Sequence, residues 1–552
     1  MGSGMAELLK KVSNASAARA AAGLCTLLAI FLHIVFASQA GALWRDEVNT
    51  LEIATMRTWS DMWASLCFDS FPGLFFVLLR GVAGVPATIS DAGLRIFGLV
   101  IGLVGIGVVW LNARWLRLGV PLLSLALIGF NPMIIRYSDS IRAYGLGLAL
   151  ALLTLGAMWR LLESFTPRNL AMAILTAVLS VQCLYSNSVL LLAICFGAAA
   201  VTLRRGRLNQ TLAVLMIGGV SAATLLPYLP TIHRVQSWNY VWKAAFTPTV
   251  LWQKTSETLG APLSLGAWVW AALVLVAVGS GTTMLLLRRI KNESLSERKE
   301  RVLFALVTLV AGSAAYAAFL HVLGYLTQPW YYIVFAAFAA TCTEMVFASI
   351  SEARWLLGGR TILALLLAAG FSYPATQALR ARQTNVDLVA RRLEGLAGRE
   401  DLILINPWFY GVSFQHYFHG SASYSTIPPL EDHRSHRADL LVKEMMSPDA
   451  LAPTLQTMTE TLQGGHAIWL VGPVDFLPAG QKPRAIAPAT EETKKARTPD
   501  FSQMWSEQTG FFLQTHGGHF ERVQVSNNKP VSRYENLPLS VIRGWRPEPA
   551  PQ

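Results

Sequence analysis

Charged side chains are scarce in this sequence of 552 residues. Asp, Glu, Lys and Arg together make up 14% of it, against 53% hydrophobic residues, and the mean hydropathy is +0.42. A soluble fold of this length cannot bury so much apolar surface. The composition therefore excludes an ordinary soluble globular protein and makes a lipid bilayer the solvent for much of the chain.

Cysteine motifs and nucleotide-binding motifs are also lacking. None of the five cysteines forms a CxxC pair, and all but Cys67 lie inside apolar blocks. The sequence therefore indicates neither a zinc site nor a disulfide framework. The polar C-terminal part has no GxGxxG and no phosphate loop, which leaves a nucleotide site there unsupported. We expect no cofactor, and only a divalent cation stays open.

The net charge of +12 has two explanations, nucleic-acid binding and membrane topology. Membrane proteins concentrate Lys and Arg in their cytoplasmic loops, so a positive balance follows without any nucleic acid. We prefer this explanation and expect membrane lipids, and no nucleic acid, among the partners.

Apolar runs long enough to cross a bilayer predict about eleven transmembrane helices. They lie near 20–41, 93–113, 119–136, 143–162, 169–187, 188–204, 210–230, 263–287, 302–321, 331–350 and 357–375. The fold class is thus an α-helical polytopic membrane protein with a C-terminal soluble α/β domain. We expect a transmembrane domain over 1–375, with outer loops 42–92 and 231–262, and a soluble domain over 376–552.

Basic residues set the expected topology. With a cytoplasmic N-terminus, the cluster RRIKNESLSERKER at 288–301 and most other basic loop residues face inward, and the C-terminal domain lies outside. The apolar stretch 72–84 is too short to span, so we expect a juxtamembrane helix along the outer interface.

The C-terminal domain alternates between helical and strand patterns. The sequence predicts a helix in the polar segment that opens the domain, and others around 408–418 and 500–515. It predicts strands at 402–406, 467–471 and 520–526. This alternation indicates a small α/β layer.

The strongest chemical pattern is Arg45-Asp46-Glu47, directly after the first apolar run. A carboxylate that is partly dehydrated near a phosphate-binding cation can act as a general base toward an acceptor hydroxyl. The structural alternative, that Asp46 and Glu47 cap or solvate the end of the first helix, is equally compatible with the pattern.

Two basic patterns could bind a phosphate. Arg142 lies in RYSDSIRAYGL, where its planar fork can reach an anionic lipid head group, although an interfacial arginine reaching toward water is the simpler explanation. His233 and Arg234, with Lys243 and Lys254, occupy the loop 231–262, where solvated cations are the commoner case.

Aromatic and histidine clusters give weaker candidates. Aromatic rings at an outer turn could stack on a sugar, although interfacial belts have the same composition; this cluster is His321, Tyr325, Trp330, Tyr331 and Tyr332. Four histidines of the C-terminal domain could hold a metal, but solvated side chains are expected because spacing fixes no further ligand; these are His416, His419, His433 and His436.

Five segments in this order resemble a known family: LWRDEVNTL, CFDSFPGLFFVLLR, ISDAGLRIFGLVIGLVGIGVVWLNARWL, YSDSIRAYGL and NVDLVARRLEGLAGREDLILINPWFYGVSFQHYF. The chain is similar to membrane glycosyltransferases of the C-type fold, in the branch with protein O-mannosyltransferases and bacterial lipid A aminoarabinose transferases. The resemblance is good over 20–150 and weaker beyond. Phe71, Gly73 and Ser140 depart from the family's histidine, second proline and glutamate, so roles tied to those residues do not transfer.

The resemblance implies transfer of a single sugar from a polyprenyl-phosphate donor to a hydroxyl of a lipid, glycan or protein acceptor. It makes Asp46 the catalytic base and Glu47 its partner, with Asp69 on the juxtamembrane motif and Arg142 and Tyr144 near the donor phosphate. Together with the bottom-up candidates, the predicted site comprises Asp46, Glu47, Asp69, Arg142, Tyr144, His233, Arg234, Tyr331 and Tyr332.

The expected location is a bacterial inner membrane with the active face in the periplasm. Two other functions stay open, a flippase or transporter of a lipid-linked glycan, and an oligosaccharide ligase or polymerase. Against a transporter, the sequence shows no internal repeat and its notable charges lie at one face.

The topology can be tested at Ser294, inside the basic cluster. In a Cys67→Ser background, Ser294→Cys should react in intact cells with a permeant maleimide but not with an impermeant one added outside. Labelling by the external reagent alone would reverse the orientation of every loop after residue 85.

Overall fold

The computed structural model describes the chain except for residues 1, 86–88, 239–240, 242, 245, 262, 288–292, 326, 351–353, 491–493, 526–528 and 548–552. Residue contacts divide it into two compact units. The helical unit comprises Met1–Gln39, Phe71–Leu229 and Ala244–Arg380, and the α/β unit comprises Ala40–Ser70, Pro230–Lys243 and Ala381–Gln552. The expected outer loops 42–92 and 231–262 are thus each shared between the units.

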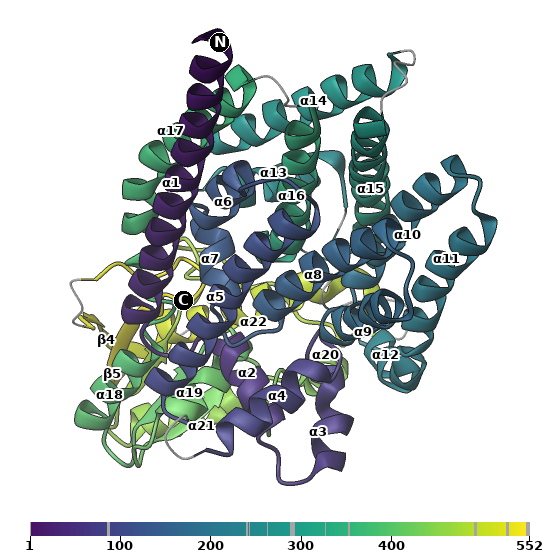
Figure 1. Cartoon of the computed structure of the whole chain (residues 1–552). Helices are drawn as coiled ribbons and strands as arrows, with labels where there is room; N and C mark the ends of the chain where they lie inside the picture. Colours follow the sequence, from purple (N-terminus) through teal and green to yellow (C-terminus); the bar gives the residue numbers. More distant parts are fainter. Residues whose placement is uncertain are drawn as a thin grey trace. The chain divides into compact units, whose positions relative to one another are not determined.

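The helical unit is built from long apolar helices, several of them packed side by side, such as α1 with α17 (Figure 1). Its elements are α1 (Gly2–Gln39), α4 (Leu74–Ala83), α5 (Asp91–Trp115), α6 (Leu122–Gly129), α7 (Pro132–Ser138), α8 (Tyr144–Glu163), α9 (Pro167–Cys183), α10 (Asn187–Arg204), α11 (Leu208–Ala223), η2 (Leu226–Tyr228), α13 (Pro248–Leu259), α14 (Leu265–Leu286), α15 (Glu293–Leu323), η4 (Pro329–Tyr332), α16 (Ile333–Ile350) and α17 (Arg354–Leu379).

Nine helical segments of the described chain are long and apolar enough to cross a membrane. The sequence predicted about eleven, and two of those spans account for the difference. The expected span 119–136 is interrupted, because the Asn131 side chain accepts hydrogen bonds from the amides of Met133 and Ile134 and Pro132 starts the new helix α7. The expected span 169–187 is α9, which has only 17 residues.

The short apolar stretch at 72–84 forms a helix of its own, as the sequence predicted. This helix, α4, has 10 residues and at 1.5 Å per residue reaches about half of a bilayer core of about 30 Å. Of the basic cluster 288–301, residues 288–292 lie outside the described residues, and α15 begins at Glu293.

Buried polar pairs join helices within the apolar interior of this unit. The ring Nδ1 of His33 on α1 lies 2.7 Å and 2.9 Å from the two carboxylate oxygens of Asp139, which follows α7. Gly102 on α5 makes room for the pair, since a Cβ there would lie 1.9 Å from Asp139 Oδ1. In the same way Glu344 on α16 accepts the amide of Ser124 at 2.8 Å and pairs with Arg360 on α17.

The α/β unit contains a five-stranded sheet in the order β2-β1-β3-β5-β4. The strands are β1 (Leu402–Ile405), β2 (Ser423–Thr426), β3 (Ile468–Val471), β4 (Gly517–Val523) and β5 (Leu539–Trp545). The strand β1 pairs in parallel with both β2 and β3, whereas β5 pairs antiparallel to β3 and β4. Sheets of this mixed kind arise when α-helical crossovers precede a closing hairpin.

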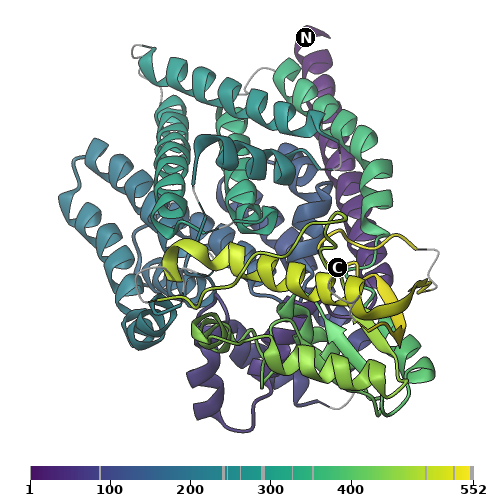
Figure 2. The same cartoon turned by 180° about the vertical axis from the view of Figure 1, so that it is seen from behind.

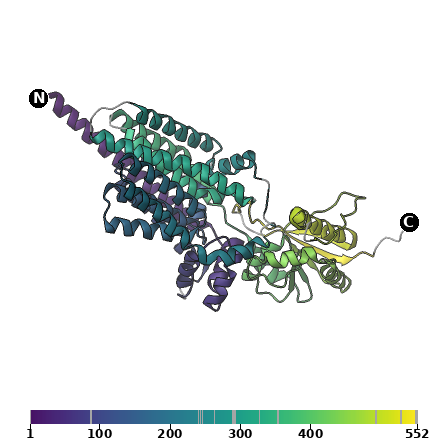
Figure 3. The same cartoon turned by 90° about the vertical axis from the view of Figure 1, so that its right-hand side faces the viewer.

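Helices cover both faces of this sheet (Figures 2 and 3). Side chains alternate along each strand, so Leu402 and Leu404 join one core and Ile403 and Ile405 the other. The first core is closed by α20 (Ala438–Met446), α21 (Ala452–Gln463) and α22 (Lys494–His516), and the second by α18 (Val386–Leu396) and α19 (Gly411–Tyr417).

The predicted α/β layer is therefore confirmed, including the strands at 402–406, 467–471 and 520–526, of which residue 526 lies outside the described residues. The sequence analysis missed β2, β5, α20 and α21. The burial of β2 is irregular, so its sequence has no clear period to read.

Asp401 joins the start of β1 to β3 through hydrogen bonds of its side chain. Its carboxylate accepts the amides of Ala467 and Gly398, each at 2.8 Å, and the indole N–H of Trp469 at 2.9 Å. Asp401→Ala should cost about 2–4 kcal/mol of unfolding free energy, since three donors lose a charged acceptor. A thermal melt of the purified protein would show a lower melting temperature for Asp401→Ala. The control is Glu400→Ala, at the exposed neighbouring position, which should keep the melting temperature of the parent protein. Equal melting of the two variants would contradict it.

Candidate active site

The predicted carboxylates lie on α2 (Arg45–Ala54), at the start of the α/β unit. The chain reaches this helix through Gly41, whose φ of +70° favours glycine. A side chain there would also collide with the guanidinium of Arg382, whose Cζ lies 2.5 Å from the position of a Cβ. The sequence therefore allows a tight turn just ahead of the Arg-Asp-Glu pattern.

Glu47 has a capping function, but at the start of α2 and not at the end of the first helix, as the sequence analysis had considered. Its side chain accepts the amide of Trp44 at 3.1 Å as half of a capping box, and the residue is fully buried. Asp46 differs, since 18% of its side chain is exposed. Of the two neighbouring carboxylates, Asp46 is the one that a ligand can reach.

Arg45 is held by the C-terminal part of the unit. Glu535 accepts the Arg45 amide at 2.9 Å, and the Tyr534 carbonyl accepts a guanidinium N–H at 2.8 Å. The guanidinium also lies over the ring of Phe409 at 4.8 Å. This arrangement leaves the Arg45 Nε 3.5 Å from Asp46 Oδ1, so a fixed cation stands beside the candidate base.

The Glu535 carboxylate itself is fully buried. Besides Arg45 it accepts hydrogen bonds from the hydroxyls of Thr384 and Ser413, each at 2.9 Å. Burial raises the pKa of Glu535 above its usual range, and the charge and hydrogen bonds of Arg45 act in the opposite direction. Removing this carboxylate would leave three donors without their acceptor.

Asp46 also lies near His436, which the sequence analysis placed among solvated histidines. That expectation is wrong, because the His436 side chain is 15% exposed and its Nε2 lies 3.4 Å from Asp46 Oδ1. His433 is also buried, with 9% of its surface exposed. The Nδ1 of His416 lies 3.0 Å from Glu52 Oε1. Only the fold brings His436 and His416 to α2, so no sequence spacing could have indicated them.

Asp69 is tied to α2 as well. Its Oδ2 accepts the Thr50 hydroxyl at 2.8 Å, and the neighbouring Phe68 carbonyl accepts the Asn49 side-chain amide at 3.2 Å. Asp46 lies on α2 and Asp69 is hydrogen-bonded to the same helix, although 23 positions separate the two residues in the sequence.

His233 and Arg234 lie on α12 (Leu229–Gln236). Arg234 donates to the Ala64 carbonyl at 3.0 Å, at the end of α3 (Trp59–Ser65). The His233 ring lies 3.3 Å from Gln236 on its own helix and is exposed. Arg234 also donates to the sulfur of Cys67 at 3.9 Å, so it holds the segment that follows α3.

The remaining predicted residues lie in the helical unit and form an aromatic cluster around Arg142. The buried Arg142 guanidinium lies 4.5 Å from the ring centre of Phe71 and 6.0 Å from that of Tyr144. Tyr144 in turn lies 6.3 Å from Tyr331. Phe71 stands where the similar family has a histidine, and here it supplies a cation–π face.

The side chain of Tyr332 makes a different contact from that of Tyr331. It is 2% exposed, and its hydroxyl lies 2.9 Å from that of Thr327. The structure therefore places Arg142, Tyr144 and Tyr331 together and buries Tyr332 beside them.

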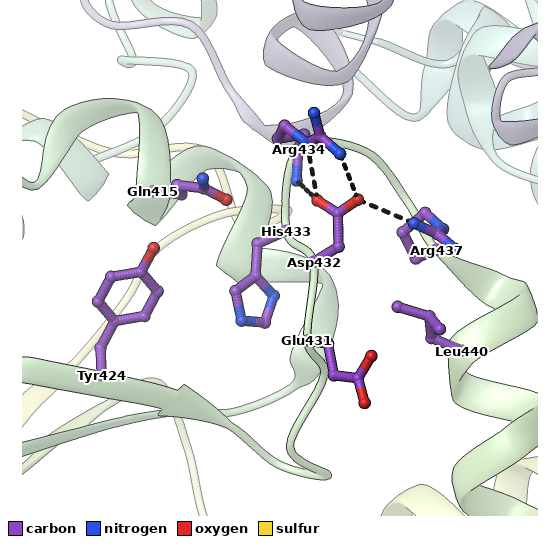
Figure 4. A pocket seen from close by; sticks show the side chains of 8 residues that line it. All are labelled: Gln415, Tyr424, Glu431, Asp432, His433, Arg434, Arg437 and Leu440. Atoms are coloured by element: carbon purple, nitrogen blue, oxygen red, sulfur yellow. Dashed lines mark hydrogen bonds and ion pairs between the residues drawn. The ribbon is translucent and has the colours of Figure 1, made fainter.

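A polar pocket of about 480 Å³ lies in the α/β unit (Figure 4). It is lined by Gln415, Tyr424, Glu431, Asp432, His433, Arg434, Arg437 and Leu440. Asp432 accepts from Arg434 at 3.0 Å and from Arg437 at 2.8 Å. Burial raises the pKa of Asp432, but the two arginines outweigh it and lower the pKa to about 2. Burial lowers the pKa of His433.

Comparison with known proteins gives a likeness in structure only. No protein-family profile matches the sequence, and no curated protein is significantly similar to it. ArnT from Cupriavidus metallidurans, in a crystal structure with undecaprenyl phosphate, is 12% identical with a TM-score of 0.50, over 94% of this chain and 97% of ArnT.

The chain has the C-type glycosyltransferase fold. The Archaeoglobus fulgidus oligosaccharyltransferase, solved with a tethered acceptor peptide, is a more distant likeness, at 10% identity and a TM-score of 0.47 over 94% of this chain and 74% of that one. Together with the nine apolar helices of the described chain, the shared fold supports a multi-pass membrane protein.

The Asp432 carboxylate offers a test of the pocket's electrostatics. With its pKa lowered from 3.8 to about 2, Asp432 stabilises the fold above about pH 3.8 and loses this contribution as the pH falls toward 2. Asp432→Asn should therefore lower the melting temperature at pH 7 and converge with the parent protein near pH 2.

The control is Glu431→Gln, at the adjacent position, where the side chain is 80% exposed and should have little effect. A loss from Asp432→Asn that stays constant from pH 7 to pH 2 would contradict the electrostatic explanation.

Proposed function

We propose that the protein is a glycosyltransferase that moves a single sugar from a polyprenyl-phosphate donor to a hydroxyl of a lipid, glycan or protein acceptor. The observation that carries this proposal is the fold shared with ArnT, which was solved with undecaprenyl phosphate bound. The carboxylate and arginine clusters, each found at residues that the sequence pattern had singled out, support it.

Asp46 is the general base of the proposed reaction. It is the more accessible carboxylate of the pair, whereas Glu47 caps the helix and so holds Asp46 in place. Asp46 would accept the proton of the acceptor hydroxyl while that oxygen attacks the anomeric carbon of the donor sugar. Arg45, at 3.5 Å, favours the ionised carboxylate that this step requires.

The leaving group of this reaction is the lipid phosphate, which carries its negative charge away and needs little protonation. Arg142 is proposed to bind it, since a buried guanidinium offers a planar fork to phosphate oxygens where the low dielectric strengthens the attraction. Arg234 and His233 are secondary candidates. One carboxylate base and cations then suffice, without the second carboxylate of a hydrolase.

Sugar recognition is assigned to Asp69, Tyr144 and Tyr331. Asp69 can accept hydrogen bonds from sugar hydroxyls, and the Tyr144 and Tyr331 rings offer apolar faces next to Arg142. Tyr332, buried with its hydroxyl at Thr327, is proposed to support Tyr331 from behind.

We also propose a bacterial inner membrane as the location, with the α/β unit and the reaction on the periplasmic side. No cofactor is needed for the steps above. Within the described residues no three of His, Cys, Asp and Glu gather as a metal site would require.

Replacing Asp46 tests the proposal directly. Purified protein in nanodiscs would receive the polyprenyl-phosphate lipids and the acceptor fraction extracted from host membranes, with mass spectrometry of the products. Asp46→Asn should lower transfer by about 100-fold or more, because an amide cannot accept the proton, with an unchanged melting temperature. The matched control is Glu52→Gln, on the same helix but paired with His416.

The products also separate the alternative functions. A mass increase of one sugar supports the proposal, whereas addition of a long glycan would identify a ligase or polymerase. Movement of the lipid across the bilayer without a modified acceptor would identify a flippase. Wild-type turnover by Asp46→Asn would remove Asp46 from the mechanism.

A further inference from the structure

His436 comes from a part of the chain far from α2 in sequence. It lies between β2 and α20, and its amide donates to the Asn49 side-chain oxygen at 2.8 Å. Asn49 belongs to the same helix as Asp46. The backbone of His436 is therefore fixed to the helix that carries the proposed base.

The imidazole ring of His436 is buried without a hydrogen bond of its own. Both ring nitrogens are inaccessible to solvent and have no hydrogen-bond partner. The nearest acid group is Asp46, whose Oδ1 lies 3.4 Å from Nε2, just beyond a good hydrogen bond. A buried polar group left unpaired is costly, which suggests a use for it in the working protein.

The charges around this ring leave Asp46 as its one ionic neighbour on α2. Arg45 approaches the same carboxylate oxygen as His436, with its Nε 3.5 Å from Asp46 Oδ1. On the segment of His436 itself, Asp432 holds the guanidinium of Arg434, and it shares that of Arg437 with Asp439 (Figure 4). From η5 (Trp408–Tyr410), the Trp408 ring faces the imidazole edge at 6.3 Å.

We propose that His436 is a positioning residue that takes up the proton collected by Asp46. This inference rests on the proposed function. The acceptor O–H bond breaks and its proton passes to Asp46, while the oxygen forms a bond to the anomeric carbon. The C–O bond to the lipid phosphate breaks, and its electron pair leaves with the phosphate. The Asp46 proton then passes to His436 Nε2, which restores the carboxylate.

The neighbouring groups make His436 the suitable recipient. Arg45 is permanently protonated and cannot accept a proton. An imidazole changes its charge near neutral pH, and Nε2 of His436, 3.4 Å from Asp46 Oδ1, can take the proton and hand it back through Asp46 once the product has left. Protonated His436 and ionised Asp46 attract each other, so the transfer leaves two opposite charges side by side and the base is ready for the next acceptor.

The test combines loss of the ring with chemical rescue. His436→Ala should lower kcat by about 100-fold and leave KM for the donor lipid within about twofold, because the ring touches the base and not the donor. Added imidazole should restore at least a tenth of the lost rate to His436→Ala and nothing to Asp46→Asn. The rescue should follow the neutral form of imidazole as the pH is raised.

Two controls keep the test specific. His433→Ala removes a buried histidine from the same segment, one that lines the pocket beside Tyr424, and should neither lose the rate nor respond to imidazole. If His436→Ala does not fold, His436→Gln keeps most of the volume and hydrogen-bonding capacity without titrating, and should show the same loss of kcat with a changed pH–rate profile.

The outcomes separate this inference from the proposed function. Inactive Asp46→Asn with fully active His436→Ala and His436→Gln would overturn the role of His436 alone. A slow His436→Ala that imidazole does not rescue, with an unchanged pH–rate profile, would also overturn it, in favour of a purely structural role. Active Asp46→Asn would remove Asp46 from the mechanism and the role of His436 with it, whereas a parent protein that transfers no single sugar would overturn the proposed function itself.

Discussion

The α/β unit depends on a buried charge contact, between the carboxylate of Glu535 and Arg45. Glu535 lies just before β5 and accepts hydrogen bonds from Arg45, Thr384 and Ser413. A buried carboxylate is tolerated only when its acceptor sites are filled, so these three parts of the chain must come together. Through Arg45 this requirement fixes the start of α2, and thereby the direction in which the proposed base points.

The same contact explains why adjacent acidic residues have different roles. Glu47 is buried and its carboxylate accepts a hydrogen bond from the amide of Trp44. The Asp46 carboxylate instead lies near Arg45 and His436. Neighbours on a helix point about 100° apart, and thus only one of them can face the cap. The helix that Glu47 stabilises is the support on which the chemistry of Asp46 would depend.

Much of the architecture could be predicted because it follows from local patterns. Apolar length indicated the long helices, and short continuous apolar runs indicated the buried strands β1 and β3. The single helix expected over 119–136 is wrong, because Asn131 caps a new helix that begins at Pro132. The segment is apolar throughout, so its hydropathy does not reveal this break. The strand β2 was missed because its sequence does not alternate between apolar and polar residues. Its place in the sheet comes from parallel pairing with β1.

The sequence by itself determined the membrane character and the C-terminal α/β layer and indicated Asp46 and Arg142 as candidates, because composition, periodicity and short motifs are local properties. Only the tertiary structure decided that Glu47 is a cap, that Phe71 lies against Arg142, and that His436 and Glu535 meet α2. Apart from the local cap between Glu47 and Trp44, these contacts join residues 71 to 490 positions apart, and no local pattern carries their register. They depend on the packing of a sheet and its helices, where burial forces each polar group to find a partner.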